Sequence, residues 1–318
     1  MDITPEINQR LTLLEQKFTA MGQDLTSYLD GLLHANFLTY WDYIHLDTLL
    51  SLQNPKTPFH DEKIFIIYHQ ITELYFKLTL IEFERLTNNR ELNIKSLLQG
   101  ITRINRYFEN LVMSFDVMVD GMDPAEFMKF RMSLLPASGF QSGQYRMIEV
   151  YCTDFIQLVD KDKRDSFSVD EKIETLYENL YWKAGATELS TGNKTLTLKQ
   201  FEEKYGNEIV LLGEGLRKTN LRQLYKNISG AQNPDSGIIE ALRLLDSNVN
   251  VNWPLAHYKS AVRYLQKDPE DIKATGGTNW QKYLPPRFQK RVFYPELWSE
   301  EELANWGKSW VEKNVFPK

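Results

Sequence analysis

The stretch that decides the fold is DEKIFIIYHQITELYFKLTLIEFERL, residues 61–86. Apolar residues recur along it with the spacing of a helix, so the pattern predicts one long helix. Asp61 is the expected N-cap residue, and Glu62 in the first turn would stabilise the helix dipole. Two prolines in the preceding segment, residues 54–60, end the element before it.

Helical periodicity also dominates the rest of the chain. Residues 4–37 predict one or two helices, with Leu11, Leu14 and Phe18 along one stripe. No Val/Ile/Thr-rich segment alternates like a strand, and no internal repeat is found. We therefore expect an all-α fold: a single large helical domain over residues 38–318 and an N-terminal helical arm over residues 1–37. Further helices are expected in the ranges 40–53, 93–119, 125–135, 140–159, 169–183, 197–227, 236–247, 255–266 and 299–314, with Ser299 as the last N-cap.

Composition narrows the function classes. The chain has 318 residues, of which 42% are apolar and 25% charged, as in ordinary globular proteins. Its formal charge of −6 argues against a nucleic-acid partner. One cysteine, Cys152, excludes a disulfide framework and a cysteine zinc cluster. The polar N-terminus is unlike a signal peptide, and no apolar run reaches the ~18 residues of a membrane helix, so we expect a cytoplasmic protein.

His69 stands directly behind a run of bulky apolar residues, FIIY, residues 65–68. Phe65 and His69 are four residues apart and share one face of the expected helix. One interpretation is a core histidine bonded to a carboxylate or carbonyl group. The other is an imidazole that faces an aromatic pocket as an acid, a base or a hydrogen-bond partner.

Arg131 interrupts a second apolar stripe formed with Phe127 and Leu134. An arginine keeps its charge in proteins, so on an apolar face it needs an anion. That anion is either a structural carboxylate or the carboxylate of a ligand, gripped by the planar fork. Tyr145 and Arg146, which follow the break at Pro136, are compatible with simple packing.

His257 lies in NWPLAHYKSAVRYL, residues 252–265. The ligand spacings of a closed zinc site are absent, but one histidine is enough to bind haem iron axially. A structural role is the alternative. The glycines of ATGGT, residues 274–278, allow close approach of a ligand without the residue order of a phosphate-binding loop.

Four blocks of the sequence resemble signature blocks of the tryptophan 2,3-dioxygenase family, in the same order. They are YWDYIHLDTLLSLQNP (40–55), HDEKIFIIYHQITELYFK (60–77), FMKFRMSLLPASGFQSGQYR (127–146) and NWPLAHYKSAVRYL with KATGGT (252–278). The resemblance implies an all-helical protein with one haem b per subunit, working as a homotetramer. It implies insertion of O2 across the indole C2–C3 bond of L-tryptophan to give N-formylkynurenine, the first step of the kynurenine pathway.

The resemblance also implies roles for individual residues. His257 resembles the axial haem ligand, and His69 the distal histidine that faces the indole N–H. Arg131 resembles the clamp on the substrate carboxylate, and Thr275 the hydroxyl that meets the substrate ammonium. The remaining implied positions are Phe65, Ile66, Ile67, Tyr68, Phe127 and Leu134 around the substrate, Ser138 and Gly139 at the cofactor, and Tyr40 and Tyr43, which would reach a neighbouring subunit's pocket.

One loop departs from the family pattern. Members commonly read GTGGSSG where this chain has Ala274, Thr275, Gly276, Gly277, Thr278, Asn279 and Trp280. The change puts substrate preference, more than haem binding, in question. Two alternatives therefore stay open: a histidine-ligated haem monooxygenase that hydroxylates an aromatic amino acid, and a non-enzymatic haem or ligand sensor.

Overall fold

The computed structural model describes residues 3–187, 193–229, 236–265 and 286–308, and in these ranges the fold is built from helices. Besides two isolated β-bridges, Val159 with Leu180 and Thr187 with Lys194, the described residues form no β-structure. The expected all-α class is confirmed. The chain divides into two compact units, Met1–Gln53 and Asn54–Lys318, so the division falls after Gln53, whereas the sequence suggested residue 37.

The described residues of the first unit form four helices. They are α1 (Pro5–Ala20), α2 (Leu25–His34), α3 (Tyr40–Tyr43) and α4 (Leu46–Leu50). Thr4 caps α1 by accepting from the Ile7 N–H, and Asp24 caps α2 by accepting from two backbone N–H groups. Over the described residues of this unit, none of the four helices has a buried residue.

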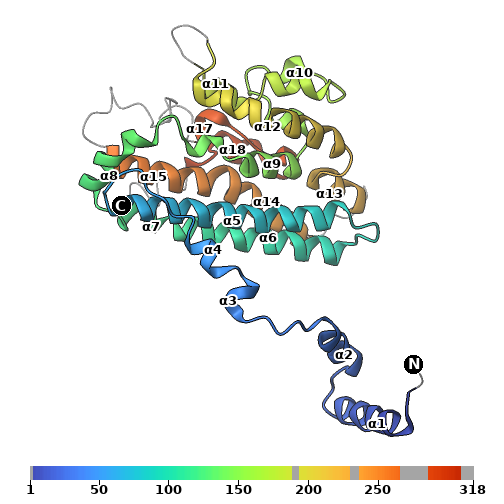
Figure 1. Ribbon diagram of the computed structural model, residues 1–318. Coiled ribbons are helices and arrows are strands. Elements are labelled where there is room, and N and C mark those ends of the chain that lie inside the picture. The colour runs from blue at the N-terminus through green and yellow to red at the C-terminus, as the bar shows by residue number, and fades with distance from the viewer. Residues whose placement is uncertain (1–2, 188–192, 230–235, 266–285, 309–318) are drawn as a thin grey trace. The chain divides into compact units, whose positions relative to one another are not determined.

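The second unit is organised around α5 (Asp61–Thr87) and α6 (Ile94–Ser114), which lie side by side (Figure 1). The long helix predicted for residues 61–86 is present. Its N-cap is His60, and Asp61 is the first helical residue, a shift of one position from the expected cap. Asn93 and Ser96 form a capping box that starts α6.

Gly100 sets the distance between these two helices. A Cβ atom at this position would lie 2.7 Å from a methyl group of Leu86, so a larger residue would push α6 away from α5. Close approach lets both helices contribute large side chains to one core. Phe83, Ile104 and Phe108 are each 0% exposed there.

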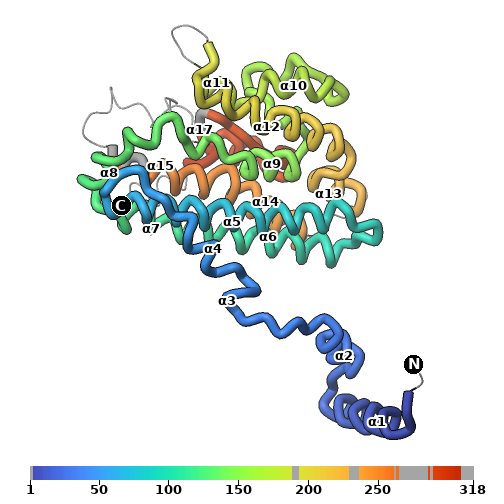
Figure 2. The backbone as a smooth tube through the Cα atoms, in the orientation of Figure 1, coloured from blue at the N-terminus to red at the C-terminus, as the bar shows by residue number. Residues whose placement is uncertain are grey.

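Shorter helices cover this pair and complete the unit (Figure 2). The first of them in chain order are α7 (Asp116–Asp120), α8 (Pro124–Phe130), η1 (Arg131–Leu134), η2 (Gly139–Gln141), α9 (Gly143–Cys152), η3 (Phe155–Leu158), η4 (Arg164–Ser166), α10 (Ile173–Glu178) and α11 (Tyr181–Gly185). They are followed by α12 (Leu196–Gly215), α13 (Leu221–Ser229), α14 (Ser236–Ser247), η5 (Asn248–Asn252), α15 (Trp253–Leu265), α17 (Pro286–Gln289), η6 (Pro295–Leu297) and α18 (Glu300–Ala304). Ser299 caps α18 as predicted, in a capping box with Glu302.

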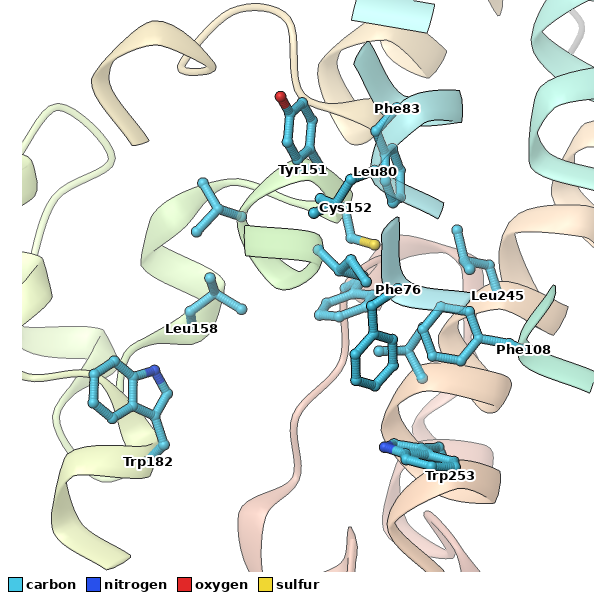
Figure 3. Packing of buried hydrophobic residues seen from close by; sticks show 14 of the residues in the cluster. Phe76, Leu80, Phe83, Phe108, Tyr151, Cys152, Leu158, Trp182, Leu245 and Trp253 are labelled. Atoms are coloured by element: carbon cyan, nitrogen blue, oxygen red, sulfur yellow. The ribbon is translucent and has the colours of Figure 1, made fainter. Parts of the chain in front are cut away.

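The core brings together side chains that are far apart in the sequence. Phe76, Phe108, Cys152 and Leu245 come from α5, α6, α9 and α14 and gather in one cluster (Figure 3). Burial of each such aliphatic or aromatic side chain stabilises the fold by about 1.5–3 kcal/mol. Among the described helices, none is long and apolar enough to cross a membrane.

One stretch of π-helix interrupts the last long helical run. Residues Asn248–Asn252 form η5, which joins α14 directly to α15 without a loop. Asn248 and Asn250 are buried, and Asn250 donates to the Asp246 carboxylate at 2.6 Å. Single-turn π segments often mark functional sites in helical proteins. Here the segment leads into the helix that carries His257.

Candidate active site

A cavity of about 240 Å³ lies inside the second unit. Its walls come from α5, α9, α11, α15, α17 and the segments beside them. His69 of α5 and His257 of α15 both line it, together with the rings of Phe76, Phe115 and Trp253. The structure therefore brings the two histidines singled out from the sequence to one cavity, which is largely apolar near them.

The ring of His69 is fixed by its own helix. Its Nδ1 lies 2.7 Å from the backbone oxygen of Phe65. A carbonyl oxygen can only accept, so Nδ1 carries the proton and Nε2 keeps its lone pair. Burial lowers the pKa of His69, although the Phe65 carbonyl and the Glu73 carboxylate oppose the shift. The neutral ring thus offers one hydrogen-bond acceptor, at Nε2.

His257 has a different environment. Phe115 and Trp253 lie beside it, with ring centroids 5.3 Å and 6.4 Å from the imidazole. Within the described part of the chain, neither of its ring nitrogens makes a hydrogen bond. Burial, with a contribution from His69, lowers the pKa of His257 to about 4, so the imidazole is neutral at pH 7. A neutral imidazole without an internal partner is suited to binding a metal.

Ser138 and Gly139 also line this cavity. They belong to the turn that begins η2, where the Ser138 hydroxyl accepts from the Phe140 N–H. A Cβ atom at position 139 would lie 3.4 Å from Cε1 of His257. The glycine therefore keeps the backbone close to the histidine ring.

The aromatic residues expected around a substrate form a separate cluster next to His69. Phe65 lies 4.1 Å from the His69 ring and 6.4 Å from Phe127, measured between centroids. Phe127 continues the cluster to Tyr264 at 4.7 Å. These rings do not line the cavity that the two histidines share. The cluster lies against one side of His69.

Arg131 and Leu134 lie in η1, close to this cluster in the chain. Arg131 is 6% exposed, and its Nη1 lies 3.8 Å from the sulfur of Met128. Burial lowers the pKa of Arg131, as expected for a cation that has lost water. Leu134 is half-buried against the core. A guanidinium is a planar fork that matches the geometry of a carboxylate.

The other expected substrate residues are placed as follows. Tyr68 is buried and lines the cavity, with its hydroxyl 3.2 Å from the Ser114 hydroxyl. Ile66 is half-buried and Ile67 is 43% exposed, and neither lines the cavity. Tyr40 and Tyr43 belong to the first unit, where they are 70% and 72% exposed. Thr275 lies outside the described residues.

The sequence did not reveal a polar network on the cavity wall. Arg146 of α9 donates to the Glu149 carboxylate at 3.1 Å and to the Tyr181 hydroxyl at 2.7 Å. Arg291 donates to the same carboxylate and to the Tyr145 hydroxyl. The i, i+3 spacing of Arg146 and Glu149 could have suggested an ion pair, but nothing local pointed to Arg291.

Comparisons with known proteins identify the family. The model of a family described as tryptophan 2,3-dioxygenase matches residues 32–196. A protein named tryptophan 2,3-dioxygenase from Herpetosiphon aurantiacus is 31% identical over 269 residues, which are 82% of this chain and 96% of that relative. The chain belongs to the tryptophan 2,3-dioxygenase family. The suspected relationship is confirmed.

Other family members match over different lengths. The protein of the same name from Bradyrhizobium diazoefficiens is 29% identical over 271 residues, covering 82% of this chain and 91% of that one. The relative from Ruegeria sp. is 42% identical over 116 residues, so this match spans 36% of the chain and 41% of the relative. Three of the four blocks quoted above lie inside the range of the family model, and the block with His257 follows it.

Proposed function

We propose that this chain is a haem-dependent dioxygenase that inserts O2 across the indole C2–C3 bond of L-tryptophan and gives N-formylkynurenine, the first step of the kynurenine pathway. One observation carries the proposal. In a member of the tryptophan 2,3-dioxygenase family, one cavity holds both histidines: His257, which has no hydrogen-bond partner among the residues that the structure describes, and His69, whose acceptor nitrogen is fixed. The relatives that carry this name support the reaction.

The residues of the cavity fit a haem. Its apolar rings at Phe76, Phe115 and Trp253 suit a flat macrocycle, and its one imidazole without a hydrogen bond among the described residues suits an axial ligand. His257 would bind the iron of one haem b per subunit, and Ser138 and Gly139 would lie beside the ring. When bound, the haem supplies the redox chemistry with O2.

The protein's own part is to bind, orient and exclude water. Nε2 of His69 would accept a hydrogen bond from the indole N–H, because Nδ1 already donates to the Phe65 carbonyl. Phe65 and Phe127 would pack against the indole ring, and Arg131 would hold the substrate carboxylate with its planar fork. Contacts at both ends of the amino acid fix its orientation. Thr275 is proposed to meet the ammonium group.

The assembly is proposed to be a homotetramer in the cytoplasm, with no nucleic-acid or membrane partner. Two exposed apolar surfaces support an oligomer. On α5 a stripe at helical spacing faces away from the core: Ile67, Ile71, Leu74, Leu78 and Ile81, each 39–53% exposed. In the first unit, Tyr40 and Tyr43 are available to reach a neighbouring subunit. Exposed apolar stripes of this length usually mark an interface.

The test is direct. Reduced, haem-loaded protein given 18O2 and L-tryptophan should form N-formylkynurenine with both labelled oxygen atoms, as measured by mass spectrometry. L-Tyrosine should react poorly, since its ring cannot offer the indole N–H to His69 and the acceptor would stay unpaired. Transfer of a single oxygen to L-tyrosine, with tryptophan unchanged, would establish the aromatic hydroxylase instead. Haem binding without turnover of either amino acid would indicate the sensor.

A further inference from the structure

The guanidinium of Arg146 occupies an aromatic box on the cavity wall. The residue is 9% exposed and still lines the cavity. Its central carbon lies 5.3–5.7 Å from four ring centroids, those of Phe140, Tyr145, Tyr181 and Trp182. Rings at this distance stabilise the positive charge and hold the planar group in one orientation. The guanidinium is thus fixed before any ligand arrives.

Hydrogen bonds are found for only one of the three nitrogens of this guanidinium in the described part of the chain. Its hydrogen bonds to Glu149 and Tyr181 all come from Nη1. Nε is buried and has no hydrogen-bond partner in the part of the chain that the structure describes, and no bond from Nη2 is found there either. A buried donor without an acceptor is unfavourable, and an arginine fork is shaped to hold a planar anion.

The carboxylate that pairs with Arg146 is shared with a second guanidinium. Arg291 donates to the same Glu149 carboxylate, so two guanidinium groups share one carboxylate. The donors of Arg291 are largely used, because they also reach Asn250, the Tyr145 hydroxyl and the backbone oxygen of Val249. Glu73 also lines the cavity, and its carboxylate accepts from Gln144 at 2.8 Å. The unsatisfied donors of Arg146 therefore point to an anion that the described residues do not supply.

We propose that Arg146 binds a carboxylate of the cofactor, one of the two propionate groups of haem, through its Nε and Nη2 side. This inference rests on the proposed function, since it requires that the cavity take a haem. Haem carries two carboxylates, and bidentate arginine–carboxylate pairs combine charge with fixed geometry. His257 would hold the iron and Arg146 would fix the rotation of the macrocycle about it. Arg131 remains the proposed group for the substrate carboxylate.

The test compares two forms of the cofactor. Haemin and its dimethyl ester, in which both carboxylates are blocked, are titrated into the purified full-length protein, and Soret absorbance gives each affinity. The wild type should prefer haemin by roughly ten- to hundredfold, as expected for a charged hydrogen-bonded pair. Arg146→Gln should lose most of this preference while the ester binds nearly as before. Arg146→Lys, which keeps the charge without the fork, should show an intermediate preference.

A half-buried, ion-paired arginine provides the control. Arg222 pairs with Asp154 and Glu296, both at 2.8 Å, and does not line the cavity. Arg222→Gln should lower the melting temperature and leave the haemin preference unchanged. If Arg146→Gln does not fold, as judged by circular dichroism, the comparison of the wild type with Arg146→Lys carries the test.

Three outcomes would overturn the inference: no haemin preference in the wild type, the same preference in Arg146→Lys or Arg146→Gln as in the wild type, or equal weakening of haemin and ester in Arg146→Gln. The last would assign Arg146 to the stability of the fold. Failure of the proposed function looks different, because then the wild type would bind neither porphyrin or would leave tryptophan unchanged.

Discussion

The two units of the chain use apolar helices in opposite ways. In the second unit, α6 has 21 residues, of which seven are buried, including Leu97, Ile104 and Phe108. In the first unit, α1 has 16 residues and none is buried, and Leu13 and Leu14 are 58% and 39% exposed. Both sequences carry the spacing of an amphipathic helix. They differ in burial: the apolar face of α6 is covered by other helices of its own unit, and that of α1 is exposed.

This contrast suggests that the two units are stabilised in different ways. The second unit has its own core and its own cavity, so its cofactor site should depend on residues of that unit alone. The helices of the first unit keep their apolar side chains exposed, and helices of this length gain most of their stability from packing. The first unit should therefore depend on a second copy of the chain. The predictions below test this separation, from the largest expected effect to the smallest.

Replacing His257 should remove haem binding. His257→Ala deletes the imidazole proposed to ligate the iron, so the purified variant should lack a histidine-ligated Soret spectrum. His34→Ala and His45→Ala change exposed residues of the first unit and should leave haem content normal. Normal haem content in His257→Ala would refute the assignment of His257 as the iron ligand. It would also remove the basis for expecting that the second unit binds haem with its own residues.

Deleting residues 1–45 of the first unit should abolish activity and leave haem binding intact. A variant lacking residues 1–45 should keep haem, lose activity and form smaller assemblies, because Tyr40 and Tyr43 would no longer reach a neighbour. Gel filtration with light scattering, haem absorbance and product formation measure the three properties. The double variant Tyr40→Ala, Tyr43→Ala is the matched control, expected to assemble and yet lose activity. A fully active monomer at low protein concentration would break the comparison.

Arg131→Ala should weaken binding of L-tryptophan by about 2–5 kcal/mol, the range for removing one partner of a buried charge pair. Haem content should stay unchanged, since the effect belongs to the substrate side. Equilibrium titration of the ferric protein measures it. Lys129→Ala, an exposed cation two residues away, is the control and should bind as the wild type does. Unchanged affinity in Arg131→Ala would make this arginine a structural residue.

Core and arm substitutions should differ in their dependence on concentration. Ile104 is 0% exposed, so Ile104→Ala should lower the free energy of unfolding by about 2–5 kcal/mol at any protein concentration. Leu13 is 58% exposed, so Leu13→Ala should stay within about 0.5 kcal/mol in the dissociated protein. At concentrations where the protein assembles, Leu13→Ala should lower the free energy of unfolding by more than this. Denaturant titrations at two concentrations decide between these outcomes.

Particular residues show what the sequence could predict. Spacing was sufficient for the long helix at residues 61–86, for the Ser299 cap and for the pairing of Phe65 with His69 on one face. It could not tell which apolar side of α5 faces the core, because apolar residues occur on both. Ile67, which the family resemblance places around the substrate, is 43% exposed and does not line the cavity.

Long-range contacts were beyond the sequence for a different reason. Arg291 donates to Glu149 across 142 positions of the chain, a pairing that no local spacing encodes. Arg146, which looked like a packing residue, becomes a cavity residue only when α11 brings Tyr181 and Trp182 against it. The sequence shows that these arginines are present, but it does not show which residues they contact in the fold.

The π-helical segment Asn248–Asn252 has a consequence for insertions and deletions. Because it joins α14 and α15 without a loop, the number of residues in it fixes the rotational phase of everything that follows. Removing a single residue there would turn α15 by about 100° about its axis, the angle between successive residues of a helix. His257 would then leave the cavity although α15 itself had not changed. Length variation among related chains should therefore avoid this segment and concentrate in their loops.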